Sequence, residues 1–136
     1  MVQFTAVISD PKTGKSYQTV VSGHHANSLI GKKLGDEFDG IFVGLPGYKL
    51  VIRGGSDRDG FPMRRDLPGP KRRKVLVSRS AGYRMDERGV RRRRHLRGNT
   101  ISPDIVQLNL RISAHGSKPI EDALKAKGEQ PQAKKA

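Results

Sequence analysis

The most regular pattern of hydrophobic and polar positions lies in residues 105–112, where apolar and polar side chains alternate from position 106 onward. The apolar positions, which we expect to face the core, are Val106, Leu108, Leu110 and Ile112. The polar positions, which we expect to face solvent, are Gln107, Asn109 and Arg111. A period of two residues is typical of a half-buried strand. The pattern therefore predicts a strand over residues 105–112.

The start of the chain has the pattern of a β-hairpin. Residues 2–8 contain β-branched and aromatic residues with partial alternation, and residues 15–21 repeat this composition. The segment between them, residues 10–14, contains Asp, Pro and Gly, which favour turns. Two antiparallel strands joined by this turn are expected.

The next segment predicts a short helix and two strands. Asn27 is a plausible N-cap for a helix that runs to Lys33, and Gly35 is suited to end it. Turn-rich residues flank a brief strand expected over residues 41–43, and a further strand is expected over residues 48–53.

The remaining pattern adds a short apolar strand over residues 75–77 and a short helix over residues 119–127. Together these elements predict a mainly β fold: a small barrel-like roll of about six short strands with one short helix, basic loops and a flexible C-terminal tail. We expect residues 1–116 to form the barrel-like domain and residues 117–136 to hold the short helix and a disordered tail.

Composition narrows the functional classes. No cysteine is present, which excludes disulfides and thiolate metal ligands. No stretch approaches the roughly 18 apolar residues that a membrane span needs, and no signal peptide is evident at the start of the chain. We therefore expect no membrane partner.

Charge is concentrated in residues 64–98, the basic segment. The whole chain has a formal net charge of +14, and this segment supplies 14 basic and 3 acidic side chains, a net +11. Arginine outnumbers lysine there by 12 to 2. Arginine binds phosphate through two parallel hydrogen bonds and stacks on bases, which indicates a nucleic-acid partner. The alternative is a localisation signal or a solvated loop.

Residues 53–63, Arg-Gly-Gly-Ser-Asp-Arg-Asp-Gly-Phe-Pro-Met, separate the strand over residues 48–53 from the basic segment. We interpret them as a rigid loop. At least one glycine of the pair at positions 54 and 55 is expected at positive φ, and Asp57 and Asp59 are expected to tighten a turn by bonding backbone N–H groups. Phe61 and Met63 are expected to pin the loop to a core.

Other motifs give weaker hypotheses. Gly14-Lys15-Ser16 resembles the end of a phosphate-binding loop, but Ser9 stands where that motif needs glycine, and a strand follows instead of a helix. Adjacent histidines 24 and 25 point to opposite faces of an extended chain, which disfavours a shared metal. No nucleophile or histidine accompanies the two aspartates at positions 57 and 59, so no catalytic site is indicated. We expect no cofactor, metal or small-molecule substrate.

Residues 52–63 resemble the signature of a known family. The pattern has six fixed positions, all present here: Gly54, Gly55, Asp57, Gly60, Pro62 and Met63. The chain thereby resembles the archaeal and eukaryotic small-subunit ribosomal protein six family, the "six-e" type. The resemblance continues through residues 75–78, 83–84, 91–94, 96–98 and 108–110, and it covers roughly residues 1–116. The chain stops at Ala136 without the long basic extension of eukaryotic members, which looks like the archaeal form.

The resemblance implies a structural, non-enzymatic component of the small ribosomal subunit, cytoplasmic and in the ribosome, with ribosomal RNA and neighbouring ribosomal proteins as partners. RNA is contacted mainly through its backbone and shape. The residues that we expect to bind RNA, with Tyr83 as a stacking surface, are Lys71, Arg72, Arg73, Arg79, Tyr83, Arg84, Arg88, Arg91, Arg92, Arg93, Arg94 and Arg97. The alternatives are a free nucleic-acid-binding regulator or nucleoid-type protein that uses the same basic segment, and a phosphotransfer or nucleotide-binding enzyme.

Overall fold

The computed structural model describes residues 2–128. Its strands are β1 (Gln3–Ser9), β2 (Ser16–Ser22), β3 (Glu37–Asp39), β4 (Lys49–Asp57), β5 (Arg72–Val77), β6 (Arg92–Arg97) and β7 (Ile105–Ala114). Its helices are α1 (His24–Leu29), the 3-10 helix η1 (Gly40–Val43) and α2 (Ile120–Gly128). The prediction of a mainly β fold is confirmed.

Five strands form one curled sheet in the order β2-β1-β7-β4-β3. The neighbours are antiparallel except β1 and β7, which run parallel. We call this sheet, with α1, η1 and α2, the body. The predicted hairpin over residues 2–21 is present as β1 and β2, one residue later in the chain than expected.

The core of the body lies on one face of the sheet and includes buried side chains of α1, η1 and α2. Alternate residues of the central strands supply its fully buried side chains, among them Phe4, Ile8, Leu50, Ile52 and Leu110. Burying each of these side chains contributes about 1.5–3 kcal/mol before the entropy of ordering the chain is subtracted. The curled sheet is thus held by one continuous apolar layer.

The predicted strand over residues 105–112 is present as β7, but its first apolar assignment is wrong. Ile105 is buried, whereas Val106 is 44% exposed. The cause is a shift in register between β4 and β7: Asp57 pairs with Ile105 and Ser56 with Gln107, so Val106 lies outside the alternation. Such a bulge is invisible to a pattern that assumes a strict period of two.

Two predictions in the middle of the chain are wrong. Residues 41–43 form the 3-10 helix η1, not a strand, because Gly44 takes a left-handed φ of 88° and turns the chain back. The strand in this region is β3, which precedes it and pairs with β4. The helix predicted over residues 27–33 instead runs from His24 to Leu29, after which Gly31 adopts a φ of 92°.

Strand β4 continues through the glycine pair, so the loop expected over residues 53–63 begins only after Asp57. Neither Gly54 nor Gly55 has positive φ, which corrects that expectation. Close approach explains Gly55 instead: a Cβ there would lie 2.6 Å from the carbonyl oxygen of Gln107 on β7. Gly60 does turn the chain, with a φ of 85°.

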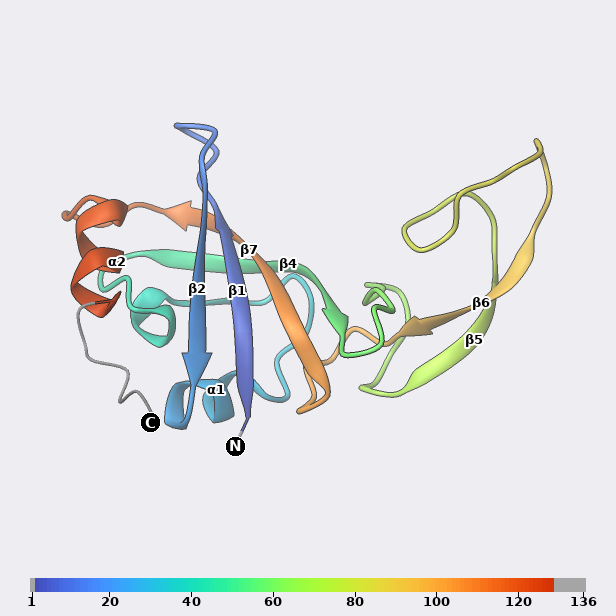
Figure 1. Ribbon diagram of the computed structural model, residues 1–136, viewed down its shortest axis with the longest axis horizontal. Helices are drawn as coiled ribbons and strands as arrows, with labels where there is room; N and C mark the ends of the chain where they lie inside the picture. The colour runs from blue at the N-terminus through green and yellow to red at the C-terminus, as the bar shows by residue number, and fades with distance from the viewer. Residues whose placement is uncertain (1, 129–136) are drawn as a thin grey trace, which may run out of the picture.

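Strands β5 and β6 form a separate two-stranded sheet that extends from one side of the body (Figure 1). We call residues 71–97 the arm. The strand predicted over residues 75–77 is the second half of β5, which begins earlier, at Arg72. The sequence pattern predicted no strand for the arginine-rich residues 91–97, but residues 92–97 form β6.

At the end of the described chain, helix α2 matches the helix predicted over residues 119–127 to within one residue at each end. The disordered tail predicted for residues 128–136 lies, apart from Gly128, outside the described residues. No helix within residues 2–128 is both long and apolar enough to cross a membrane.

Candidate nucleic-acid interface

The arm is a β-ribbon whose two strands are rich in cations. The antiparallel register places Arg72 opposite Arg97 and Val77 opposite Arg92. Because side chains alternate across a strand, each face of the ribbon carries every second residue of both strands. One face is covered and the other is open.

The covered face packs on a small core of its own. Val77 and Leu96 from the ribbon and Tyr83 from the loop that joins its strands are buried together, with Leu67 and Met85 packed against them. This core is separate from the core of the body, and it fixes the path of the connecting loop over the ribbon.

The open face presents four exposed side chains between its paired ends: Lys74, Leu76, Arg93 and His95. Leu76 is 53% exposed. A cationic face with an apolar contact on it suits a partner that has both negative charge and stacked or sugar surfaces, as RNA does.

The predicted RNA-binding residues divide into two groups. The exposed cations, which face solvent on the ribbon, its loop or its flanks, are Lys71, Arg73, Arg79, Arg84, Arg88, Arg91, Arg92, Arg93 and Arg94. Within residues 2–128 these nine side chains make no ion pair with a carboxylate. Their charges remain available to a partner. Lys74 is exposed in the same way, and the set predicted from the sequence missed it although it belongs to the same basic run.

Arg97 and Arg72 are placed differently, at what we call the root of the arm, formed by these two residues with Asp57. The Asp57 side chain is fully buried. Its Oδ2 accepts hydrogen bonds from Arg72 Nη2 at 2.8 Å and Arg72 Nε at 3.2 Å, and from Arg97 Nη1 at 3.4 Å. Arg97, only 7% exposed, also donates to Ser102 and Asp104, each at 3.0 Å.

The second carboxylate oxygen of Asp57 tightens the turn that follows β4. Asp57 Oδ1 accepts the backbone N–H groups of Asp59 and Phe61, both at 3.0 Å, as the sequence predicted for this aspartate. Burial alone would raise the pKa of Asp57, but hydrogen bonds from Arg72 and from these N–H groups outweigh it and hold the pKa below 3.8. The carboxylate is therefore ionised at neutral pH.

Phe61 and Met63 both anchor this turn, but at different places. Met63 is buried in the core of the body, and its N–H donates to Gly55 O at 2.9 Å. Phe61 packs on the ribbon: the Arg72 guanidinium lies 4.5 Å from the Phe61 ring centroid, and the His95 ring lies 5.6 Å away. Phe61 thus attaches this turn to the arm, and Met63 attaches it to the body.

Pro62 completes this junction. Its carbonyl accepts the N–H of Arg97 at 2.9 Å, and its ring lies against Gly82 so closely that a Cβ on Gly82 would be 2.8 Å from Pro62 Cγ. Backbone and side chains together leave the ribbon little freedom at its base.

Tyr83 does not present its ring to solvent. It is 4% exposed, the Arg94 guanidinium lies 5.5 Å from its ring centroid, and its hydroxyl donates to Val90 O at 3.3 Å. Tyr83 is thus a core residue of the arm, and its burial argues against the predicted stacking on a base.

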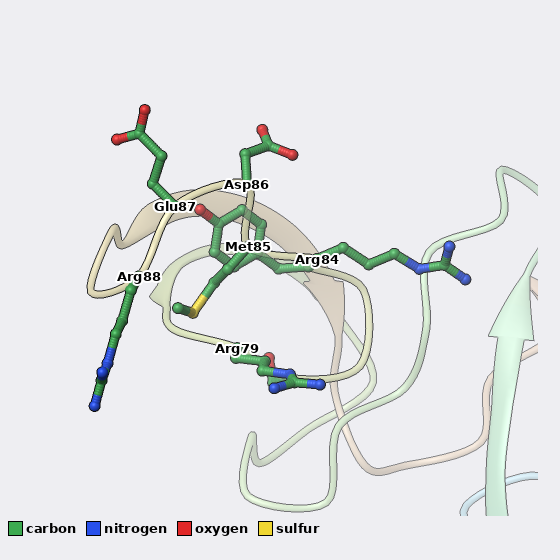
Figure 2. Close-up of a pocket in the computed structure, with 8 residues that line it drawn as sticks. Arg79, Arg84, Met85, Asp86, Glu87 and Arg88 are labelled. Carbon is green, nitrogen blue, oxygen red and sulfur yellow. The ribbon is translucent and has the colours of Figure 1, made fainter.

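The connecting loop forms a hollow of about 910 Å³ beside Tyr83 and Met85. Figure 2 shows Arg84 extending to the right and Arg88 extending downward at the left, with the Asp86 carboxylate on the side away from Arg79. The side chains do not converge on one point. This geometry suits several separate contacts to an extended polyanion and not the capture of a single small molecule.

Comparison with known proteins agrees with these features. The sequence model of the family described as "Ribosomal protein S6e" matches residues 4–125. A protein of Methanocella arvoryzae named "Small ribosomal subunit protein eS6" is 55% identical over 90% of this chain and 86% of its own length. The protein of the same name in Archaeoglobus fulgidus is 53% identical over 94% of this chain and its own full length. That of Methanocaldococcus jannaschii is 48% identical over 90% and 91%.

The family match spans the body, the root and the arm, and the relatives align over nearly their whole lengths. Three of the residues at the junction between body and arm, Asp57, Pro62 and Met63, are fixed positions of the signature, and they lie within the matched region. The chain therefore belongs to the ribosomal protein S6e family.

Proposed function

We propose that this protein is a structural constituent of the small ribosomal subunit in the cytoplasm, and that it binds ribosomal RNA through the exposed cations of the arm. The observation that carries the proposal is the set of nine predicted cations and Lys74, which face solvent and make no ion pair with a carboxylate within residues 2–128. The names of the relatives, which describe small-subunit proteins, support the ribosomal setting.

The arm would bind the RNA backbone. An exposed cluster of like charges is electrostatically unfavourable by itself, and a chain of phosphates neutralises it with release of counterions. Arginine forks suit phosphate oxygens, and a ribbon held away from the body offers both its open face and its loop to the RNA.

In this proposal Arg72 and Arg97 act by positioning the arm. Their guanidinium groups bind Asp57, and Arg97 is almost fully buried, so contact with a phosphate would require the root to open. We infer the same indirect role for Tyr83, which supports the loop from its buried core. We assign RNA contact to the nine exposed predicted residues and Lys74.

We further propose that residues 1–116 act as the RNA-binding unit and that neighbouring ribosomal proteins contact the remaining surface of the body. The alternative is a free nucleic-acid-binding regulator that uses the same arm. Both functions need the same cations, so the charge of the arm does not separate them.

Fractionation of cell extracts separates the two functions. A structural constituent is expected to sediment with the small subunit in a sucrose gradient. It should remain there after a wash at about 0.5 M salt, because many simultaneous contacts bind it. Crosslinking should then recover ribosomal RNA joined to the arm. A protein found mainly at the top of the gradient, or crosslinked mainly to DNA, would overturn the proposal.

A further inference from the structure

A second group of cations lies on the outer face of the five-stranded sheet, outside the basic segment, and makes no ion pair within the described part of the chain. Lys12, Arg53 and Arg111 line a hollow of about 480 Å³, which we call the sheet hollow. Its walls include Val51 and the imidazole of His115. No carboxylate is among the residues that line it.

The sheet register brings these side chains together. Arg111 on β7 is paired with Val51 on β4 and with Ser9 on β1, so it lies in the middle of the sheet. Arg53 follows Val51 by two residues, at the irregularity between β4 and β7. Lys12 comes from the β1–β2 turn, which is fixed because Asp10 Oδ1 accepts the Lys12 N–H at 3.0 Å.

The charges of this group are not used inside the protein. Within residues 2–128, the side chains of Lys12, Arg53 and Arg111 make no ion pair or hydrogen bond. Two carboxylates belong to residues close to these cations. Asp10 is buried, and its Oδ1 lies 3.0 Å from His115 Nε2. Glu37 is in register with Val51 and forms no ion pair with the described cations.

This setting differs from the root of the arm, where both arginines are bound to Asp57. Three unpaired cations around a shallow, partly apolar floor match a phosphodiester unit, with the phosphate between the guanidinium groups and the sugar on Val51. Two of the three cations are fixed on strands, so little backbone entropy would be lost on binding.

We infer that the sheet hollow is a second phosphate-binding site, for the backbone of an RNA segment other than the one held by the arm. The inference rests on the proposed function in that it takes RNA as the partner. In Figure 1 the C-terminal end of β7 lies on the side of the body away from the arm, and the β1–β2 turn projects from the top of the body. The protein would thus bridge two RNA segments.

The test uses the full chain and a ten-nucleotide uridine RNA as the probe. Backbone amide shifts are followed by NMR during titration of three variants. The hollow variant is Arg53→Gln with Arg111→Gln, the arm variant is Arg91→Gln, Arg92→Gln and Arg93→Gln, and the charge control is Lys33→Gln with Lys125→Gln. The control pair is exposed and does not line the sheet hollow.

We expect saturable shifts at residues 12, 53 and 111 in wild type, in the control and in the arm variant, and their loss in the hollow variant. The log–log salt slope of affinity should fall by about 0.7 for each phosphate contact removed. Absence of shifts at the sheet hollow in wild type would overturn the inference, as would their loss in the arm variant. Shifts confined to the arm would overturn the inference and leave the proposed function intact. Shifts confined to the sheet hollow would support the inference and reject the role of the arm.

Discussion

At the scale of single residues, Asp57 has the largest structural role of the signature positions. Its two oxygens serve different parts of the molecule: Oδ1 holds the turn after β4, and Oδ2 holds the arginines at positions 72 and 97. A buried carboxylate is costly unless it is paired and hydrogen-bonded, and here both conditions are met. The sequence predicted its turn bonds, because these are local in the chain.

The partners of Asp57 on the arm were not predictable in the same way. Arg97 lies 40 residues further along, and its sequence neighbours are the exposed arginines of the same tract. The composition of a basic run does not predict which of its arginine side chains is buried. The strand register decides this, since Arg97 and Arg72 are paired across the ribbon at its base.

Replacing Asp57 tests the root. We expect Asp57→Asn to lower the free energy of unfolding by about 1–3 kcal/mol, because it leaves buried guanidinium N–H groups without a charged acceptor. Urea unfolding provides the measurement. Asp59→Asn is the matched control, since Asp59 is 55% exposed and contacts the same Arg72, and we expect it to cost at most about 1 kcal/mol. Equal losses in the two variants would contradict the role of the root.

The pH dependence follows from the same residue. The folded pKa of Asp57 lies below 3.8, so its stabilising effect is present above the unfolded pKa and is lost as pH falls through the folded value. We therefore expect the difference in unfolding free energy between wild type and Asp57→Asn to shrink as the pH is lowered from 6 to about 3. A difference that stays constant over this range would show that the charge of Asp57 does not stabilise the fold.

The glycine pair gives a second residue-scale prediction, now for a steric reason. A Cβ at Gly55 would lie 2.6 Å from Gln107 O and 3.0 Å from Met63 Sδ, whereas one at Gly54 would meet only Asn109 Nδ2 at 3.8 Å. We expect Gly55→Ala to destabilise the protein by about 1–3 kcal/mol and Gly54→Ala to have a much smaller effect. Thermal melts of both variants decide this, and a more harmful Gly54→Ala would refute it.

At the scale of elements, the arm is a ribbon that carries its own small core. A two-stranded ribbon alone is marginally stable in water, and the burial of Val77, Tyr83 and Leu96 compensates for this. Alternation predicted only residues 75–77 as a strand, because the flanking positions are charged. The ribbon carries exposed cations at consecutive positions, such as Arg92, Arg93 and Arg94, and composition alone does not distinguish such a strand from a loop.

The separate core predicts separate stability. We expect Leu96→Ala to speed hydrogen exchange throughout β5 and β6 while leaving β1 and β7 nearly unchanged, because the cavity forms in the small core of the arm. Leu110→Ala, in the core of the body, is the matched control and should speed exchange in β1, β4 and β7. Faster exchange of β1 and β7 in Leu96→Ala would contradict independent cores.

The strands and helices also show which parts of the secondary structure the sequence pattern could not predict. The alternation in β7 was predicted because one face of the strand packs on a core and the other does not, and it failed only at the bulge beside Val106. For residues 41–43, three apolar residues in a row fit a strand and a 3-10 helix equally well. The left-handed φ of Gly44 ends the helix, and the Gly44 N–H closes it by donating to Ile41 O at 3.2 Å.

At the scale of the whole molecule, a nearly neutral body holds a strongly basic arm at a fixed base. The charge imbalance of residues 64–98 was visible in the sequence, and so was the nature of the partner that it implies. The structure adds a distinction among the cations: Arg72 and Arg97 bind Asp57 at the root, whereas the exposed cations of the arm make no ion pair within residues 2–128. Fixing the arm in advance reduces the entropy lost on binding.

The central claim, that the exposed cations of the arm bind RNA phosphates, is tested most directly by the salt dependence of affinity for a transcript of the small-subunit ribosomal RNA. If about 6–10 cations neutralise phosphates, wild-type affinity should fall by about 10³–10⁵ between 50 and 200 mM salt. The variant Arg91→Gln, Arg92→Gln and Arg93→Gln should bind more weakly at low salt and show a shallower slope. An affinity for wild type that stays flat across this range, or a variant slope equal to that of wild type, would contradict the account.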